Sequence, residues 1–151
     1  MSAAVHEPPP LPPIDRVRLI RRSIRCFIFG LVGAIPCLGL GMVWLAFKLY
    51  RDIAAETGER AQLYPLFLTS AAGLYMGVAC CANDLPDGAL AAAIVVLGLQ
   101  LLFIRRQYRK NAPAEWNPAR HLVYWGLGLA NFGLIFSAVV VLLVTYGINH
   151  S

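Results

Sequence analysis

Four long stretches of this sequence contain no Asp, Glu, Lys or Arg, and they restrict the possible folds more than any other feature. They cover residues 26–47, 61–82, 89–104 and 122–148. A helix needs about 20 apolar residues to cross a hydrocarbon core of about 30 Å, and three of the runs reach that length. Backbone polar groups find no water inside a bilayer, so such segments must form helices. The sequence therefore predicts an all-α membrane protein.

The composition agrees with this class. Hydrophobic residues make up 58% of the 151 residues and charged residues 14%, whereas soluble domains have about 45–50% and about 25%. The run 89–104 is short, but flanking side chains or a locally thinner bilayer can accommodate it. We expect residues 26–151 to form a single membrane domain with hydrophobic segments 26–47, 61–82, 89–104 and 118–148.

The N-terminal region divides into two parts. Residues 1–13 hold five of the ten prolines, which predicts a disordered Pro-rich tail. Residues 14–25 place Val17, Ile20 and Ile24 on one helical face and arginines around the other, which predicts a basic amphipathic juxtamembrane helix. Its cations would contact anionic lipid headgroups. These lipid-contacting residues are Arg16, Arg18, Arg21, Arg22 and Arg25.

The segment 26–47 is interrupted by Gly33, Pro36 and Gly39. Proline removes a backbone donor and clashes with the preceding turn, and the glycines weaken the helix on both sides. Two interpretations remain open. The segment could span the bilayer with a kink at Pro36, which gives a four-helix transmembrane bundle. It could instead be re-entrant, with two half-helices that dip to mid-bilayer and return, which leaves three full transmembrane helices.

The distribution of charge favours the re-entrant interpretation. All 13 Lys and Arg residues fall in 16–25, 48–60 and 105–120. A re-entrant segment puts all of them on one side of the membrane, whereas four full spans divide them eight against five. Cytoplasmic loops carry the excess of Lys and Arg. We therefore expect a cytoplasmic N-terminus, an interfacial helix that ends before Gly58, and insertion in the bacterial cytoplasmic membrane.

Small residues recur at helical spacing in two of the apolar segments. One series has the spacing 3, 4, 3 and the other 4, 3, 4, and each forms a stripe where another helix can approach closely. The partner could lie in the same chain, in a second copy or in a larger complex. Polar Thr69, Gln100 and Asn131 could hydrogen-bond between helices. The two stripes are Ser70, Gly73, Gly77, Cys80 and Gly126, Ala130, Gly133, Ser137.

The sequence offers few groups for chemistry. The charge-free runs contain no intramembrane acid or base, which are the usual markers of transport or proton relay. We find no hydrolase motif, and the three histidines are scattered. We therefore expect no enzymatic activity, no cofactor and no metal site. The basic residues flank apolar runs and predict topology rather than nucleic-acid binding. A thiol-redox activity of Cys80 and Cys81 is the weakest alternative.

These observations favour a small non-enzymatic integral membrane protein. It would act as an accessory subunit or helix-packing partner of a membrane complex or homo-oligomer, and its partners would be anionic lipid headgroups and other membrane helices. The alternative is a small oligomeric transporter or channel. In that case the broken segment around Pro36 would line the path with backbone carbonyls.

Overall fold

The computed structural model describes residues 15–83, 85–111 and 117–150, and this part of the chain consists of helices joined by turns and short irregular segments. The predicted all-α class is therefore confirmed. The tail expected at 1–13 lies outside the described residues. The five helices are α1 (Arg16–Gly33), α2 (Leu40–Thr57), α3 (Tyr64–Ala82), α4 (Pro86–Lys110) and α5 (Arg120–His150).

Three of these helices, α3, α4 and α5, are long and apolar enough to cross a membrane. With 31 residues, α5 is the longest, about 46 Å at 1.5 Å per residue. The expected segments 61–82, 89–104 and 118–148 correspond to these helices with shifted ends. In particular, α4 continues past residue 104 to Lys110 and thereby carries four cationic residues on its last turns.

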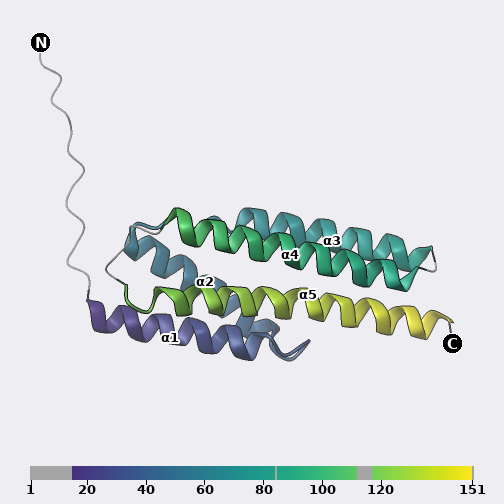
Figure 1. Ribbon diagram of the computed structural model, residues 1–151. Coiled ribbons are helices and arrows are strands. Elements are labelled where there is room, and N and C mark those ends of the chain that lie inside the picture. The colour runs from purple at the N-terminus through teal and green to yellow at the C-terminus, as the bar shows by residue number, and fades with distance from the viewer. Residues whose placement is uncertain (1–14, 84, 112–116, 151) are drawn as a thin grey trace, which may run out of the picture.

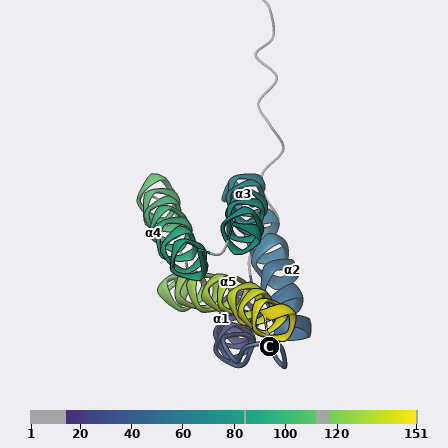
Figure 2. The same cartoon turned by 90° about the vertical axis from the view of Figure 1, so that its right-hand side faces the viewer.

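The helices form two antiparallel pairs around α5 (Figure 1). One pair is α1 and α2, and the other is α3 and α4. Of the five, α5 contacts each of the other helices. Figure 2 shows α5 between the two pairs. The α1–α2 pair extends only to about the middle of α5, and beyond it α5 is accompanied by α3 and α4 (Figure 1).

The first helix continues past the boundary that the sequence predicted at residue 25. We expected a juxtamembrane helix at 14–25 and a separate segment from residue 26, but α1 runs without interruption from Arg16 to Gly33. The side chain of Asp15 caps its start by accepting from the backbone N–H groups of Val17 and Arg18, at 3.1 and 3.2 Å. No proline occurs between Arg16 and Pro36, so nothing breaks the helix earlier.

The second helix ends as the sequence predicts. Gly58 follows Thr57 in the left-handed conformation, with φ of 69°. Such a conformation terminates helices and suits glycine, which has no Cβ to clash. The segment after it turns the chain into α3.

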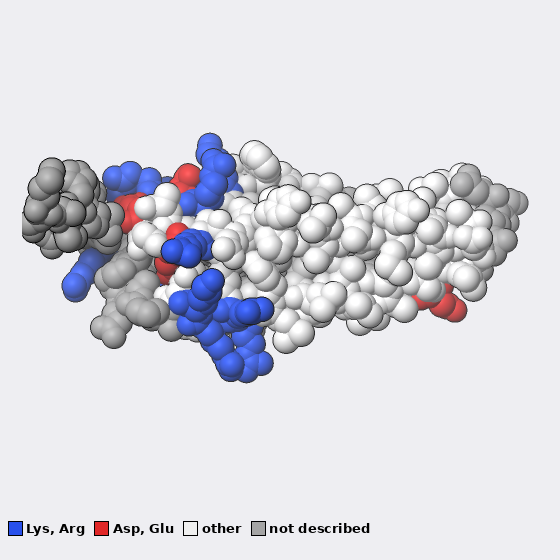
Figure 3. Space-filling view, turned by 90° about the horizontal axis from the view of Figure 1, so that it is seen from above, with Lys and Arg blue, Asp and Glu red and all other residues white. Residues whose placement is uncertain are grey.

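The hydrophobic core lies toward the end of the molecule where α1 and α2 pack on α5, and it includes Leu19, Cys26, Phe47, Tyr50 and Leu127. The Lys and Arg residues lie at that same end, as Figure 3 shows on one face. At the opposite end of the molecule, Asp87 lies in the first turn of α4. The molecule is therefore strongly asymmetric in charge along its long axis.

Candidate functional site

The broken segment forms a tight turn between α1 and α2. Ala34 ends α1, and Gly39 precedes α2. Cys37 has φ of 64°, a conformation that non-glycine residues rarely adopt. Its N–H donates to Ser137 Oγ of α5 at 2.9 Å. This hydrogen bond attaches the turn to the middle of α5.

Two backbone carbonyls of the turn, those of Ile35 and Pro36, already have donors. The Gly39 N–H donates to the Ile35 carbonyl at 3.0 Å, and the Leu38 N–H donates to the Pro36 carbonyl at 2.7 Å. Gly39 is needed here because a Cβ at this position would collide with the backbone of α1 at Val32 and Gly33. These internal hydrogen bonds reduce the capacity of the turn to coordinate an ion.

The small-residue stripe of α5 faces α1. A Cβ on Gly126 would lie 2.5 Å from the Cys26 carbonyl oxygen, and one on Gly133 would lie 2.8 Å from Ala34 Cα. Ala130 and Ser137 of the same stripe are buried. The structure thus brings the α5 stripe against a neighbouring backbone of the same chain.

A stripe of small residues on α1 packs against the α5 stripe, and the sequence analysis did not predict it. Four small residues are buried on its α5-facing side: Ser23, Cys26, Gly30 and Gly33. Their spacing is 3, 4, 3, the same signal that identified the stripe on α3. The predicted boundary at residue 25 separates Ser23 from Cys26, so neither predicted segment contains the whole stripe.

The stripe of α3 has different neighbours. Gly73 faces Val96 of α4, where an added Cβ would lie 2.6 Å from Cγ2, and Gly77 faces Leu142 of α5. Cys80 lies against Gly88 at the start of α4. Ser70, Gly73 and Gly77 also line an apolar cavity of about 170 Å³ between α3, α4 and α5. The two predicted stripes therefore do not pack against each other.

Three polar residues meet in the middle of the bundle, as expected. The Nε2 of Gln100 in α4 has two hydrogens and lies within hydrogen-bonding distance of three acceptors: Thr69 Oγ1 at 2.9 Å, Ser70 Oγ at 2.8 Å and the Leu66 carbonyl at 2.9 Å. Asn131 of α5 donates to Gln100 Oε1. Gln100 and Asn131 are almost completely buried. This network joins α3, α4 and α5 at a depth where unsatisfied polar groups would be costly.

A second polar cluster lies at the basic end, and we call it the Glu59 cluster. Glu59 accepts from Arg120 Nε at 2.7 Å and from the Tyr124 hydroxyl at 2.7 Å. The side chains of Arg120 and Glu59 are only 9% and 7% exposed. Arg120 also lies over the ring of Tyr108, 4.4 Å from its centroid. This buried ion pair connects the α2–α3 segment to the start of α5.

Tyr50 and Gln107 extend this cluster toward α2. Gln107 Nε2 donates to the Tyr50 hydroxyl at 2.7 Å and to the Arg60 carbonyl at 2.6 Å. Burial raises the pKa of the Tyr50 phenol above its usual range, so the phenol stays protonated. The sequence reasoning did not identify the Glu59 cluster, because Glu59 and Arg120 are far apart in the chain and show no common spacing.

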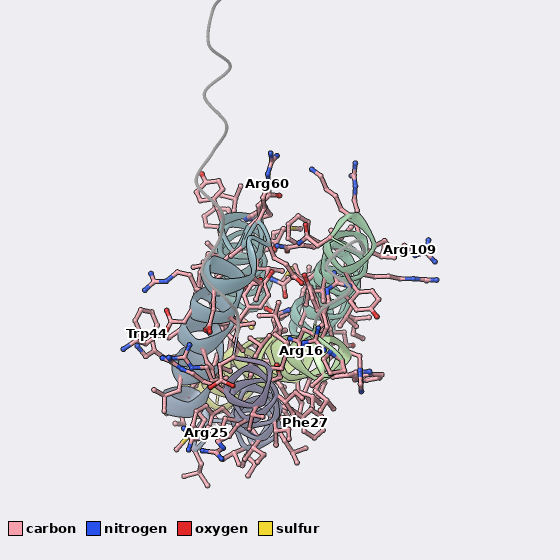
Figure 4. The ribbon with its side chains drawn as sticks, turned by 90° about the vertical axis from the view of Figure 1, so that its left-hand side faces the viewer. Arg16, Arg25, Phe27, Trp44, Arg60 and Arg109 are labelled. Carbon is pink, nitrogen blue, oxygen red and sulfur yellow. The ribbon has the colours of Figure 1, made fainter. Side chains whose placement is uncertain are left out.

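The predicted lipid-contacting arginines lie along α1. Arg16, Arg18, Arg21 and Arg25 are exposed. Arg22 is half-buried and pairs with Glu56 of α2 at 2.6 Å. Viewed from the basic end, the charged groups of Arg25, Arg60 and Arg109 point away from the bundle (Figure 4). These side chains are placed to reach groups outside the protein.

Within the part of the chain that the structure describes, no group of three or more His, Cys, Asp or Glu residues could hold a metal ion. The described cysteines Cys26, Cys37, Cys80 and Cys81 are free thiols. Comparison of the chain with protein-family models, with curated proteins and with solved structures found no significant match.

Proposed function

We propose that this chain is a small non-enzymatic integral membrane protein whose helices α3 and α4 dock a helix of a second copy or of a partner subunit. In this proposal α3, α4 and α5 cross the bilayer. The α1–α2 hairpin enters from the basic side and turns at about mid-depth. The N-terminus faces the cytoplasm, and the bacterial cytoplasmic membrane is the expected location.

The charge asymmetry supports the proposed orientation. Every Lys and Arg lies on α1, on α2 and the segment after it, on the last turns of α4, or at the start of α5. These segments share one end of the molecule (Figures 1 and 3). Positive charge is retained on the cytoplasmic side, so this end would face the cytoplasm.

The contact between the hairpin and α5 supports the proposed depth. Cys37 binds Ser137, which is the eighteenth of the 31 residues of α5. At 1.5 Å per residue the turn lies about 26 Å from the start of that helix. Irregular backbone is tolerated at membrane depth where protein surrounds it, and α5 covers one side of this turn.

One observation carries the docking function: α3 and α4 leave most of their apolar surface uncovered. Only 11% and 17% of the residues in their apolar windows are buried, against 39% in α5. Between them runs an apolar groove of about 440 Å³ on which small residues predominate, among them Ala72, Gly73, Gly88, Ala91 and Ala92. Small residues allow close approach of a second helix in a membrane.

The test is purification of the full chain from membranes in a mild detergent, with the mass of the complex measured by light scattering. We expect a homo-oligomer or a stoichiometric partner. The double substitution Ala72→Leu and Ala91→Leu fills the groove and should therefore release the second copy or the partner. Gly98→Val is the control, because it adds three carbons at a position of α4 with nothing within 4 Å. A strictly monomeric, partner-free wild-type protein would refute the docking function.

The alternative, a transporter or channel around Pro36, has less support. The carbonyls of Ile35 and Pro36 accept hydrogen bonds within the turn, so they are less able to replace the hydration shell of an ion. Ion flux through reconstituted vesicles that is abolished by Pro36→Ala would restore this alternative.

A further inference from the structure

A groove between α4 and α5 starts at the basic end of the molecule, and we call it the α4–α5 groove. Its volume of about 620 Å³ lies within the range of about 300–1,000 Å³ that is typical of ligand-binding pockets. Such pockets are mostly apolar and contain a few convergent polar groups, and this groove has the same composition. Its apolar part is lined by Leu97, Leu101, Ile104, Gly128, Leu129 and Phe132.

The polar lining residues lie at one end of the groove. Arg105 and Tyr108 come from the last turns of α4, and His121 comes from the first turn of the antiparallel α5. Leu97 lies toward the opposite end, about 16 Å from Tyr108 at 1.5 Å per residue. This length is about half of a hydrocarbon core of about 30 Å. The α4–α5 groove therefore has the length of one bilayer leaflet and a polar group only at the outer end of that leaflet.

The polar end of the groove is held in place by the Glu59 cluster. The guanidinium carbon of Arg120 lies 4.4 Å from the ring centroid of Tyr108 and 5.1 Å from that of Tyr124. The two tyrosine rings also contact each other edge to face, with centroids 5.1 Å apart. Both rings line the groove. This end of the groove is thus a preformed surface rather than a collection of free side chains.

The charge at this end suits an anion. Arg105 lines the groove and forms no ion pair within the described residues. His121, beside it on the lining, can donate a hydrogen bond through an imidazole N–H. No Asp or Glu is among the described lining residues. A ligand that matches the whole groove has an apolar chain and a negatively charged head.

These features favour a lipid over a partner helix. A helix seated along the groove would bury Arg105 against apolar side chains, and an unpaired charge is costly there. A lipid instead places its own phosphate beside that charge. The groove between α3 and α4 differs in both respects, because small residues predominate on it and no charged residue is among its described lining residues.

From this geometry we propose that the α4–α5 groove binds one acyl chain of an anionic phospholipid of the cytoplasmic leaflet. The chain lies along Leu101, Gly128 and Phe132. The phosphate accepts charge-assisted hydrogen bonds from Arg105 and a hydrogen bond from His121. The inference rests on the proposed function, which places the basic end of the molecule among cytoplasmic headgroups.

The test uses Trp125, which lines the groove, as a fluorescent reporter in a bilayer. The full chain with Trp44→Phe and Trp116→Phe retains Trp125 alone. It is reconstituted into vesicles that mix phosphatidylcholine with phosphatidylglycerol, one of which carries brominated acyl chains that quench tryptophan on contact. We expect roughly fivefold preference for phosphatidylglycerol beside Trp125.

Trp44 provides the matched reference within the same protein. Trp44 and Trp125 are both 66% exposed, but Trp44 lies on α2 and does not line the groove. A chain with Trp116→Phe and Trp125→Phe retains Trp44 alone and should show almost no preference between the two lipids. Equal preference at the two tryptophans would overturn the proposal. Shielding of Trp125 from both brominated lipids would overturn it too, because a protein surface would then cover the groove.

Two charge variants locate the phosphate. Arg105→Gln should remove most of the preference for phosphatidylglycerol beside Trp125. Arg109→Gln removes the same charge one turn later in α4, at a residue that does not line the groove, and should leave the preference nearly unchanged. Equal losses in the two variants would overturn the proposal in favour of general surface charge.

Two glycine variants locate the acyl chain. An added Cβ on Gly128 meets only Leu101 Cδ2, at an ordinary contact distance of 3.7 Å, so Gly128→Leu fills the groove without moving the backbone. It should weaken phosphatidylglycerol binding beside Trp125 roughly tenfold, because it displaces buried methylenes of the chain. Gly98→Leu is the control, since Gly98 has nothing within 4 Å and does not line the groove. Unchanged binding in Gly128→Leu would overturn the proposed path of the chain.

The same data separate this inference from the proposed function. Quenching of both tryptophans by brominated phosphatidylcholine shows that the protein is inserted in the bilayer. An inserted protein without lipid preference at Trp125 refutes this inference and leaves the proposed function intact. Absence of quenching at both tryptophans refutes membrane insertion and therefore both proposals.

Discussion

The backbones of Gly33 and Gly133 are in such close contact that a Cβ atom added to Gly133 would collide with the carbonyl oxygen of Gly33. Gly33 is the last residue of α1, and Gly133 lies near the middle of α5. No flexible side chain can move aside here, because the obstructing atoms belong to the backbone. The position of the α1–α2 hairpin therefore depends on the absence of a side chain at Gly133, as it does at Gly126.

Gly133→Ala should destabilise the protein by about 1–3 kcal/mol, the usual cost of inserting atoms into a filled contact. We expect a lower midpoint of thermal unfolding in detergent. Gly41→Ala is the control, since a Cβ on Gly41 meets nothing within 4 Å and alanine favours a helix. Equal effects of the two substitutions would contradict the close α1–α5 contact.

Glu59→Gln should be strongly destabilising, by about 3–5 kcal/mol, because it leaves the buried charge of Arg120 without its counter-ion. The matched control is Glu56→Gln, whose partner Arg22 is 28% exposed. An exposed pair contributes at most about 1 kcal/mol. Chemical unfolding of both variants measures the difference. A stability loss of the same size for Glu56→Gln would show that burial of the Glu59 cluster is not decisive.

Gln100→Leu should cost about 1–2 kcal/mol, since it removes the hydrogen bonds that join α4 to Thr69, Ser70 and Asn131. Thr145→Val is the control, because the exposed hydroxyl of Thr145 donates to the carbonyl of Val141 in its own helix. Thermal unfolding in detergent compares the two. If Gln100→Leu leaves the midpoint unchanged, the network does not hold α3, α4 and α5 together.

Membrane topology can be tested with single cysteines in an otherwise cysteine-free chain. A membrane-impermeant maleimide should label Arg51→Cys only from the cytoplasmic side and Asp87→Cys only from the outer side. Reporters fused to the two ends of the chain should lie on opposite sides, because the proposal has three crossings. Reporters on the same side would establish four spans and reduce Pro36 to a kink.

The sequence by itself determined the class of the protein. The lengths of the charge-free runs predict α3 and α5, and the shorter run 89–104 falls within α4. The run 26–47 is as long as a span, but Pro36 with its flanking glycines predicts the break between α1 and α2. Gly58 marks the end of α2. These are local properties: an apolar run, a missing backbone donor and a left-handed residue act on the chain where they occur, so they can be read without knowing any neighbour.

Only the tertiary structure decided which surfaces meet. The stripe containing Gly133 could have packed against any helix, and it packs against α1. The pairing of Glu59 with Arg120 and the hydrogen bond from Asn131 to Gln100 depend on how the helices are rotated and crossed. Those geometries minimise the free energy of the whole bundle at once, through side-chain packing and buried polar groups. The spacing of residues along one helix identifies only one of the two surfaces that form each such contact.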